Sequence, residues 1–340
     1  MEKKPVDLRS DTVTKPTPGM RKAMAEAEVG GDVMGEDPTI NRLQARAAEL
    51  FGREAALYVP SGTMGNQTCI KVHTRPGQAI IGEADCHIFG HECGMYAQFS
   101  GAVPLMINTQ RGFFSAQEVA AFITPPDVHV APIGLVLVEN THNMKGGGVY
   151  PQAQLDEVAQ FAHSKGISVH MDGARVFNAS VASGRPVSKI TQGVDSIMFC
   201  FSKGLGAPVG SMIVGKRDFI EEARAVRKKL GGGMRQAGIL AAACLYALDH
   251  HVERLADDHA HAKLLEKTLQ GLGMTVDPVE TNIVFFTMQQ PNAEEIVNKL
   301  QSQGVLCFAI TPRRIRLVTH LDVSREDVLR ACEALKRILR

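Results

Sequence analysis

The sequence predicts an α/β protein in which a mostly parallel, doubly wound sheet forms a large first part and a small α+β unit follows. Between residues 55 and 214, short apolar runs alternate with helical patterns, which is typical of strands joined by crossover helices. These runs are apolar throughout, as expected of strands that are covered by helices on both faces. After Gly273 the pattern becomes β-α-β-β-α over a short stretch, and this predicts the smaller unit.

An arm and two helices are expected before the first strand. Residues 1–18 have no helical period, and their prolines favour an extended backbone. Helices are expected over residues 19–28 and 39–51, the second with Pro38 as its start signal.

Seven strands and the helices between them make up the predicted sheet region. The strands are expected at residues 55–59, 79–81, 103–107, 135–138, 168–171, 196–201 and 210–214. The helical stretches between them are expected at residues 64–72, 87–92, 116–122 and 154–162.

A long helical stretch over about residues 235–272, broken or bent, is expected to join the two units. Beyond it, the pattern predicts strands at 283–287, 305–310 and 315–318 and helices at 293–303 and 325–339. The expected organisation is an arm over 1–18, a large domain over 19–250 and a small domain over 251–340. A cleft between two such domains is a common ligand site.

The composition excludes several functional classes. With 37 Lys+Arg against 36 Asp+Glu, the net charge is +1, which argues against binding to nucleic acid or to an anionic membrane. Any anionic ligand must therefore be small and held by a few local cations. Seven scattered cysteines without a Cys-x-x-Cys pair, no apolar signal region and no apolar run of about 18 residues predict a cytoplasmic protein.

A candidate anion site lies where the first strand ends and a helix begins. Ser61, Gly62 and Thr63 stand at this junction, where free N–H groups and the positive end of the helix would face an anion such as a phosphate. The alternative is an ordinary helix cap made by Ser61 or Thr63. It is not a nucleotide P-loop, because no Gly-Lys-Ser/Thr follows.

Two further candidates also follow apolar strands. Asp172 lies at the sheet edge where doubly wound proteins bind ligands, and Arg175 is three residues further on. The alternative is that Asp172 caps the next helix with Arg175 as its salt-bridge partner. Lys203 also follows an apolar strand, and two glycines, Gly204 and Gly206, come after it. Apolar surroundings would favour the neutral form of its amine, which is the nucleophilic form. The alternative is a lysine that extends into solvent.

Together these signals predict a pyridoxal phosphate (PLP) site. The cofactor needs a lysine for a Schiff base, an aspartate for its pyridinium nitrogen and donors for its phosphate. The three candidates occur at strand ends in this chain, and their combination is more specific than any one of them.

The sequence resembles the threonine aldolases, a family of the aspartate aminotransferase-like (fold type I) PLP enzymes, over nearly its whole length. The resemblance implies the PLP-dependent transferase-like fold for the large domain. The motifs that carry it are 7–14 (DLRSDTVT), 139–143 (ENTHN), 172–175 (DGAR), 202–206 (SKGLG), 231–236 (GGGMRQ) and 316–324 (RLVTHLDVS).

The resemblance implies roles for the cofactor residues. Lys203 would form the Schiff base, Asp172 would pair with the pyridinium nitrogen and Arg175 would contact the phenolic oxygen. The phosphate would be held at Ser61, Gly62 and Thr63, the ring would stack on His87, and Arg235 would also contact the cofactor.

The resemblance also implies the substrate site and the assembly. Ser10 and Arg316 would bind the substrate carboxylate, with Arg175 and His87 nearby. Arg235 and Lys228 would line the site from a neighbouring subunit, in a homotetramer with active sites at dimer interfaces.

The expected reaction is aldol cleavage of threonine, allo-threonine or another β-hydroxy-α-amino acid into glycine and an aldehyde. The base for the β-hydroxyl proton is His87 or His129, directly or through water, and His129 is the weaker candidate. Other PLP reactions, namely β-elimination, transamination and hydroxymethyl transfer, would use the same residues. A non-catalytic PLP scaffold is disfavoured by the intact Lys203, Asp172 and Arg316.

A zinc site is a rival interpretation of one segment, and no metal is expected. His87 and His91 would share a helix face, with Glu92 next to them. The segment is not His-Glu-x-x-His, and no distant third ligand suggests itself.

Overall fold

The computed structural model describes residues 4–125 and 127–339, so the first three residues of the predicted arm and Arg340 lie outside it. A seven-stranded sheet has the spatial order β2-β8-β7-β6-β5-β3-β4, and β8 is antiparallel to both of its neighbours while β7, β6, β5, β3 and β4 are parallel. The mostly parallel sheet is thereby confirmed. The strands are β2 (Ala55–Val59), β3 (Ala79–Glu83), β4 (Val103–Ile107), β5 (Ile133–Glu139), β6 (Ser168–Asp172), β7 (Ser196–Cys200) and β8 (Ser211–Gly215).

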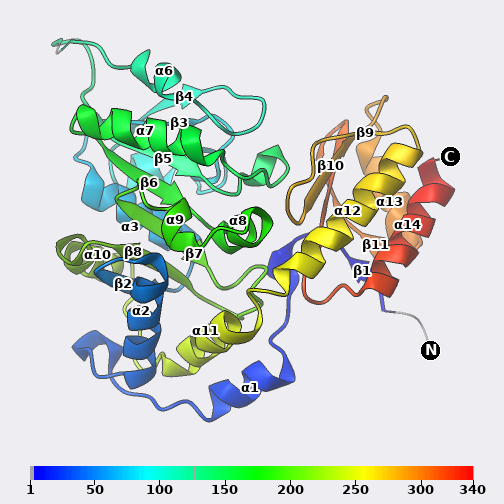
Figure 1. Cartoon of the computed structure of the whole chain (residues 1–340), viewed down its shortest axis with the longest axis horizontal. Helices are drawn as coiled ribbons and strands as arrows, with labels where there is room; N and C mark the ends of the chain where they lie inside the picture. The colour runs from blue at the N-terminus through cyan, green and yellow to red at the C-terminus, as the bar shows by residue number, and fades with distance from the viewer. Residues whose placement is uncertain (1–3, 126, 340) are drawn as a thin grey trace.

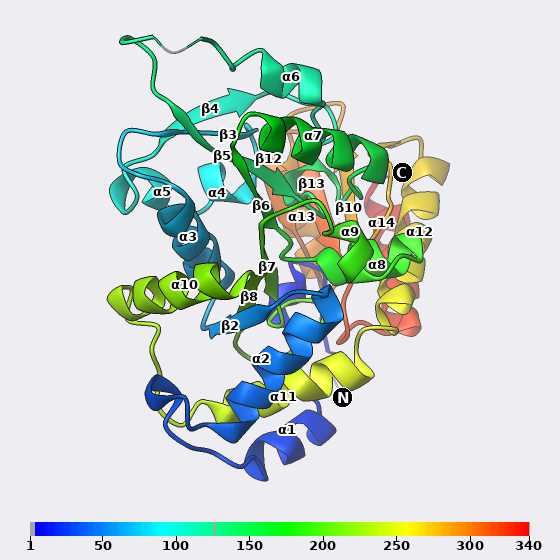
Figure 2. The ribbon, with the colours of Figure 1, turned by 60° about the vertical axis from the view of Figure 1, so that its left-hand side comes forward.

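Helices cover both faces of this sheet (Figure 2). On one face, alternate strand side chains such as Tyr58 and Val136 pack in the largest core, which also contains residues of α2 (Pro38–Phe51), α7 (Gln152–Ser164), α8 (Val176–Ser183) and α9 (Val187–Ile190). On the other face, Leu57 and Leu135 pack in separate cores with residues of α3 (Gly62–His73), α4 (His87–Gly90) and α10 (Arg217–Lys229). The continuous apolar character of the strands follows from this two-sided burial.

Helix α2 illustrates how the local sequence sets the helix ends. The Asp37 carboxylate accepts hydrogen bonds from the backbone N–H groups of Thr39 and Ile40, and Pro38 occupies the first turn, where no N–H donor is needed. Gly52 ends the helix with φ +60°, a left-handed conformation that favours glycine. The helix therefore begins one residue before the predicted start.

The long helical stretch predicted over 235–272 consists of two helices, α11 (Gly238–His250) and α12 (Leu255–Gly271). Residues 251–254 separate them, and Figure 1 shows the two helices with different directions. Helix α1 (Pro18–Ala25) lies beside α11. The expected break is confirmed, and it places α12 with the C-terminal unit.

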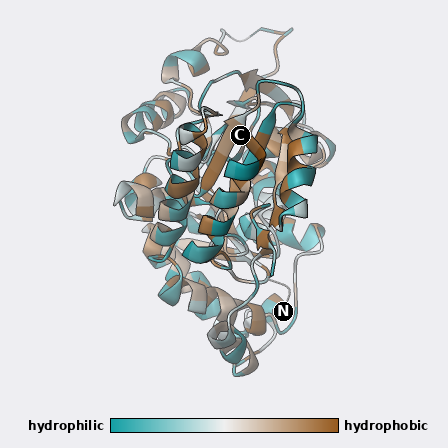
Figure 3. Ribbon diagram, turned by 90° about the vertical axis from the view of Figure 1, so that its right-hand side faces the viewer, coloured by the Kyte–Doolittle hydropathy of each residue, from teal (hydrophilic) through white to brown (hydrophobic). Residues whose placement is uncertain are grey.

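The C-terminal unit has an antiparallel sheet with the order β12-β13-β10-β9, and helices α12, α13 and α14 pack on it. In Figure 3 the strands behind these helices are mostly hydrophobic. The predicted strand 305–310 is two strands, because the pairing changes at Cys307. The elements are β9 (Thr275–Val276), β10 (Ile283–Thr287), α13 (Ala293–Ser302), β11 (Val305–Leu306), β12 (Phe308–Thr311), β13 (Arg314–Val318) and α14 (Arg325–Leu339).

The N-terminal arm belongs structurally to this C-terminal unit. Its strand β1 (Val6–Asp7) pairs in parallel with β11. The side chains of Val6 and Leu8 are buried in the same core as Leu317. The arm is thus extended, as expected, and it is held by residues of the C-terminal unit about 300 positions later in the sequence.

The remaining elements are short and lie in the connections. They are α5 (Met95–Gln98), α6 (Ala116–Ala120) and three 3₁₀ helices, η1 (Asp11–Val13), η2 (Asp32–Met34) and η3 (Asn143–Lys145). Among the described helices, none is both long and apolar enough to cross a membrane.

Candidate active site

The candidate residues gather at the carboxyl ends of the parallel strands. Asp172 is the last residue of β6, Lys203 follows β7, and His87 begins the helix after β3. Carboxyl ends of parallel strands meet at one edge of a sheet, which is where doubly wound proteins bind ligands. Arg316 reaches this edge from β13 of the C-terminal unit, where it donates to the backbone oxygen of Arg9, the residue before Ser10 in the arm.

Asp172 is a buried, ionised carboxylate. It accepts hydrogen bonds from the side-chain amide of Asn66 at 2.9 Å and from the backbone N–H of Ala174 at 3.0 Å. Burial by itself raises the pKa of Asp172, but the charges of His87 and Lys203 together with these hydrogen bonds outweigh it, so the pKa is lowered. A permanently charged carboxylate is what a protonated ring nitrogen requires as a partner.

A buried hydrogen-bonded chain supports Asp172 from inside the protein. The Asn66 side-chain oxygen lies 3.1 Å from His170 Nε2, and His170 Nδ1 lies 2.8 Å from Ser196 Oγ. Ser196 Oγ in turn lies 2.8 Å from His73 Nε2. Burial lowers the pKa of His170 to about 3 and that of His73 to about 4, so both rings are neutral at physiological pH. With His170 protonated on Nε2, its N–H donates to the Asn66 oxygen, which turns the amide donors toward Asp172.

Two glutamates fix His87. Its Nδ1 lies 2.8 Å from Glu92 Oε1, and its backbone N–H donates to Glu139 Oε2 at 2.7 Å. Burial lowers the pKa of His87, but Glu92 and Asp172 raise it more, so the net shift is upward. Because Nδ1 is engaged by Glu92, Nε2 is the ring nitrogen left for a ligand or a proton.

The structure does not group His87, His91 and Glu92, the residues of the rival zinc interpretation, as a set of metal ligands. His87, Glu92 and Asp172 are the one group of metal-ligand type found within residues 4–125 and 127–339, with ligand atoms within 4.8 Å of one another. His91 is not a member, although its ring centroid lies 5.6 Å from that of His87. The carboxylates already accept hydrogen bonds from Asn66 and His87, so the group is an internally satisfied network.

The start of α3 forms the candidate phosphate cradle. Ser61 caps the helix by accepting the backbone N–H of Met64 at 3.2 Å, as the simpler interpretation expected. The first N–H groups of a helix, here those of Gly62 and Thr63, have no acceptor within the helix. A Cβ on Gly62 would lie 2.9 Å from Cys200 Sγ, so glycine lets the cradle pack directly against β7.

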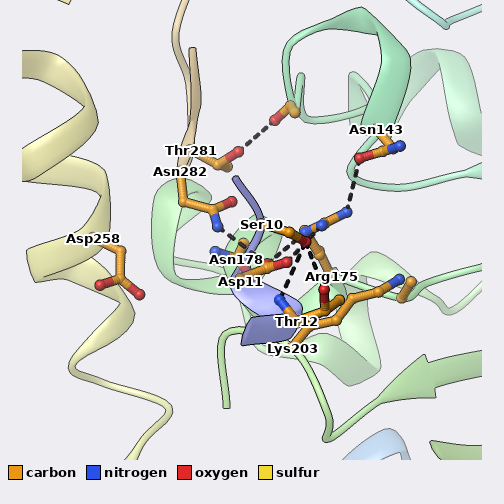
Figure 4. A network of polar contacts seen from close by, with 12 residues as sticks. Ser10, Asp11, Thr12, Asn143, Arg175, Asn178, Lys203, Asp258, Thr281 and Asn282 are labelled. Atoms are coloured by element: carbon orange, nitrogen blue, oxygen red, sulfur yellow. Dashed lines mark hydrogen bonds and ion pairs between the residues drawn. The ribbon is translucent and has the colours of Figure 1, made fainter. Parts of the chain in front are cut away.

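Arg175 does not pair with Asp172, which corrects the simpler interpretation of that pair. Its guanidinium binds the Asp11 carboxylate through two bonds of 2.7 Å, and both side chains are buried (Figure 4). The third nitrogen, Nη1, donates to Asn143 Oδ1 at 3.2 Å. Asn282 Nδ2 also donates to Asp11, at 3.2 Å. The arm thus supplies the counter-ion of Arg175.

Arg316 is a partly buried guanidinium that lacks a carboxylate partner among the described residues. It makes long hydrogen bonds to Asn143 Oδ1 at 3.3 Å and to the backbone oxygen of Arg9 at 3.4 Å, and its buried Nε is unpaired in the described part of the chain. Burial and the charge of Arg175 lower the pKa of Arg316 to about 10. Ser10 follows Arg9 and caps η1 with its hydroxyl. The arrangement suits an incoming anion.

Three sequence-derived candidates are not brought to this site within the chain. The side chain of His129 is 86% exposed and is hydrogen-bonded to Asp127. His129 precedes β5, and it is the other end of that strand, at Glu139, that lies at the site. It therefore lies at the opposite edge of the sheet, which removes it as a base for its own chain. Lys228 and Arg235 are exposed, on α10 and on the loop after it. Their contribution to a neighbouring subunit stays a prediction.

Comparisons with known proteins agree with this geometry. A family model described as beta-eliminating lyase matches residues 7–291. The chain is 45% identical over 325 residues to the low specificity L-threonine aldolase of Escherichia coli K12, across 95% of this chain and 96% of that protein. The sequence resemblance is confirmed by this match.

Solved structures share the fold. A threonine aldolase from Leishmania major superposes with a TM-score of 0.88 at 21% identity, over 99% of this chain and all of that one (100%). A lysine-to-alanine variant of serine palmitoyltransferase from S. paucimobilis with a bound PLP–myriocin aldimine gives 0.77 at 18% identity, over 98% and 88% of the two chains. The predicted fold class is confirmed, and the chain belongs to the beta-eliminating lyase family, in the group formed by the low-specificity L-threonine aldolases.

Proposed function

We propose that this protein is a PLP-dependent lyase that cleaves L-threonine, L-allo-threonine and other β-hydroxy-α-amino acids into glycine and an aldehyde such as acetaldehyde. The observation that carries the proposal is the juxtaposition of an ionised, buried Asp172 with Lys203 and an uncompensated Arg316. The 45% identical relative bears the name of the same activity.

The residues present fit the cofactor. Lys203 supplies an amine for its aldehyde, Asp172 a charge for its ring nitrogen, and the first N–H groups of α3 at Gly62 and Thr63 donors for its phosphate. His87 offers a flat face to the ring, and Arg175 a donor to the phenolic oxygen. When bound, PLP draws electrons away from a bond at the Cα of an amino acid.

The substrate residues act by orientation. A guanidinium binds a carboxylate through two parallel hydrogen bonds, and Arg316 has the free Nε for such a contact. Ser10, which follows the Arg9 that Arg316 contacts, would add a hydroxyl to this contact. Fixing the carboxylate sets which bond at Cα stands perpendicular to the ring, and for aldol cleavage this is the Cα–Cβ bond.

His87 is the residue of this chain placed to accept the β-hydroxyl proton, at Nε2, directly or through water. Its contact with Glu92 orients the ring and stabilises the protonated form after transfer. The sequence alone does not indicate this supporting role of Glu92.

The test is a set of product assays with the threonine diastereomers, with and without added PLP. We expect the wild type to form acetaldehyde and glycine without an added keto acid. Lys203→Ala should lose both turnover and the yellow Schiff-base absorbance, whereas the exposed-lysine control Lys216→Ala should keep full activity. A keto-acid requirement would indicate transamination, and 2-oxobutanoate with ammonia would indicate elimination. A colourless, fully active Lys203→Ala protein would overturn the proposal.

We also propose the finer organisation. The chain would divide into an arm (1–18), a large PLP-binding domain (19–250) and a small domain (251–340), and the separate cores of the two main units support this division. The protein would be a cytoplasmic homotetramer that consumes threonine and supplies glycine. The exposed Lys228 and Arg235 would complete a neighbour's site, so Arg235→Ala should weaken PLP binding without changing the oligomer seen by gel filtration.

A further inference from the structure

We propose that Asp11 makes the site select substrates by the number of carboxylates that they carry. By neutralising Arg175, it leaves Arg316 as the arginine of this chain that is available to a substrate carboxylate, so the site takes amino acids with one carboxylate and disfavours dicarboxylic ones. This inference rests on the proposed function and deepens it by adding a specificity determinant.

Two arginines stand side by side in the site. The Nη1 atoms of Arg175 and Arg316 lie 3.2 and 3.3 Å from the same oxygen, Oδ1 of Asn143. Like charges this close repel each other, and they are together a ready site for two carboxylates unless one of them is already compensated.

Asp11 compensates one of the two. Both of its oxygens bind Arg175 at 2.7 Å, and its side chain is fully buried between the large sheet and the C-terminal unit, where Asn282 Nδ2 also donates to it (Figure 4). A bidentate pair that is buried and supported by a third donor keeps a fixed geometry. Arg175 is therefore not free to turn to a second carboxylate.

The other charges nearby add to this selection. Asp172, Glu92 and Glu139 are all buried at the same sheet edge. Once Arg316 holds the first carboxylate, a second one would enter a region of negative groups in which, among the described residues, Arg175 is already paired with Asp11. An uncompensated buried charge is strongly disfavoured.

Replacing Asp11 by asparagine tests the idea. Asp11→Asn keeps the shape and one acceptor oxygen, but it removes the charge that holds Arg175. We expect kcat/KM for 3-hydroxyaspartate relative to threonine to rise at least tenfold. Adding Arg175→Gln to Asp11→Asn should abolish this gain.

The matched control is Asp7→Asn, which removes a bidentate aspartate–arginine pair in the same arm. Asp7 binds Arg9 at 2.9 and 2.6 Å, but the pair is partly exposed. We expect its substrate ratio to equal that of the wild type.

A binding measurement separates this proposal from the proposed function. Thermal unfolding of each PLP-loaded variant is followed with succinate and with propionate. Succinate should stabilise Asp11→Asn more than propionate does, and the order should reverse in the wild type. This binding measurement gives its answer even if the wild type cleaves no hydroxyamino acid. That absence of cleavage would refute the proposed function alone.

The proposal is overturned by an unchanged substrate ratio in a folded Asp11→Asn protein, by equal loss on both substrates, or by a gain that survives Arg175→Gln. If circular dichroism shows that Asp11→Asn is unfolded, Asp11→Ser, which leaves room for water beside Arg175, takes its place. Failure of both to fold would assign Asp11 a purely structural role and would equally refute the proposal.

Discussion

Asn66 donates its side-chain amide to Asp172 at 2.9 Å, and the same nitrogen lies 2.8 Å from Glu92 Oε1. One amide therefore donates to two buried carboxylates of the site, those of Asp172 and Glu92. In Asn66→Ala both lose a donor, and a buried acceptor left unpaired costs roughly 1–3 kcal/mol, more when it is charged. We expect a lower free energy of unfolding in urea and weaker PLP retention in dialysis. Unchanged PLP affinity would show that Asp172 does not depend on this support.

The neutral histidines behind Asn66 predict how stability changes with pH. The folded-state pKa of His73 is about 4 and that of His170 about 3, both below the usual 6.5. Between pH 6.5 and 4 the unfolded chain binds protons that the folded chain cannot, so stability is full above pH 6.5 and falls as the pH falls. His73 alone contributes a loss of about 3 kcal/mol over this window.

His73→Gln should remove that part of the slope. Its side-chain amide can still donate to Ser196, but it does not titrate. Urea unfolding at fixed pH values between 7 and 4 should give a shallower loss of stability than in the wild type, whereas the exposed-histidine control His250→Gln should follow the wild type. Parallel curves for all three proteins would contradict the assignment.

Glu139 links the proton-accepting and the carboxylate-binding sides of the site. Its carboxylate accepts the backbone N–H of His87 at 2.7 Å and that of Asn143 at 2.8 Å. Glu139→Gln turns an amide nitrogen toward one of these donors, and the unpaired group costs about 1–3 kcal/mol. We expect kcat/KM for threonine to fall about tenfold or more, with both kcat and KM affected. The exposed Glu157→Gln is the control, and an effect on kcat alone would argue against the link to Asn143.

Gly62 tests the phosphate cradle. In Gly62→Ala the new Cβ meets Cys200 Sγ at 2.9 Å and Met198 Cε at 3.2 Å, so the start of α3 must move away from β7. Such overpacking costs about 1–3 kcal/mol, and we expect PLP affinity to fall about tenfold. Gly90→Ala, whose Cβ has no neighbour within 4 Å, should bind PLP normally. Equal affinities in the two variants would place the phosphate elsewhere.

Strand ends were predictable from the sequence and contacts between distant segments were not. The apolar runs located Asp172 and Lys203 because a buried parallel strand is apolar until it leaves the sheet. Asp11 and Arg175 are separated by 164 positions, so no spacing indicates their pair, although both lie in motifs that carried the family resemblance. Sequence reasoning accordingly gave Arg175 the wrong alternative partner.

Other supporting residues were missed for the same reason. Asn66, Glu139 and Asn143 lie in segments that were recognised, but their roles depend on which side chains the fold brings together. His129 shows the reverse problem. A histidine near a predicted strand is chemically attractive, but it precedes the strand and so lies at the edge of the sheet away from the site.

The arm acts as a tether of limited length between the large domain and the C-terminal unit. At Asp7 it is hydrogen-bonded to the C-terminal unit through β1 and β11, and at Asp11 it is bound to Arg175, which stands between β6 and α8 of the large domain. Four residue steps of fully extended chain span at most about 14 Å. Any hinge motion that parts these two units further must first break the strand pair or the ion pair. Cutting the backbone between these two anchors would remove this covalent limit on how far Arg316 and Arg175 can separate, while every strand of both sheets remains in place.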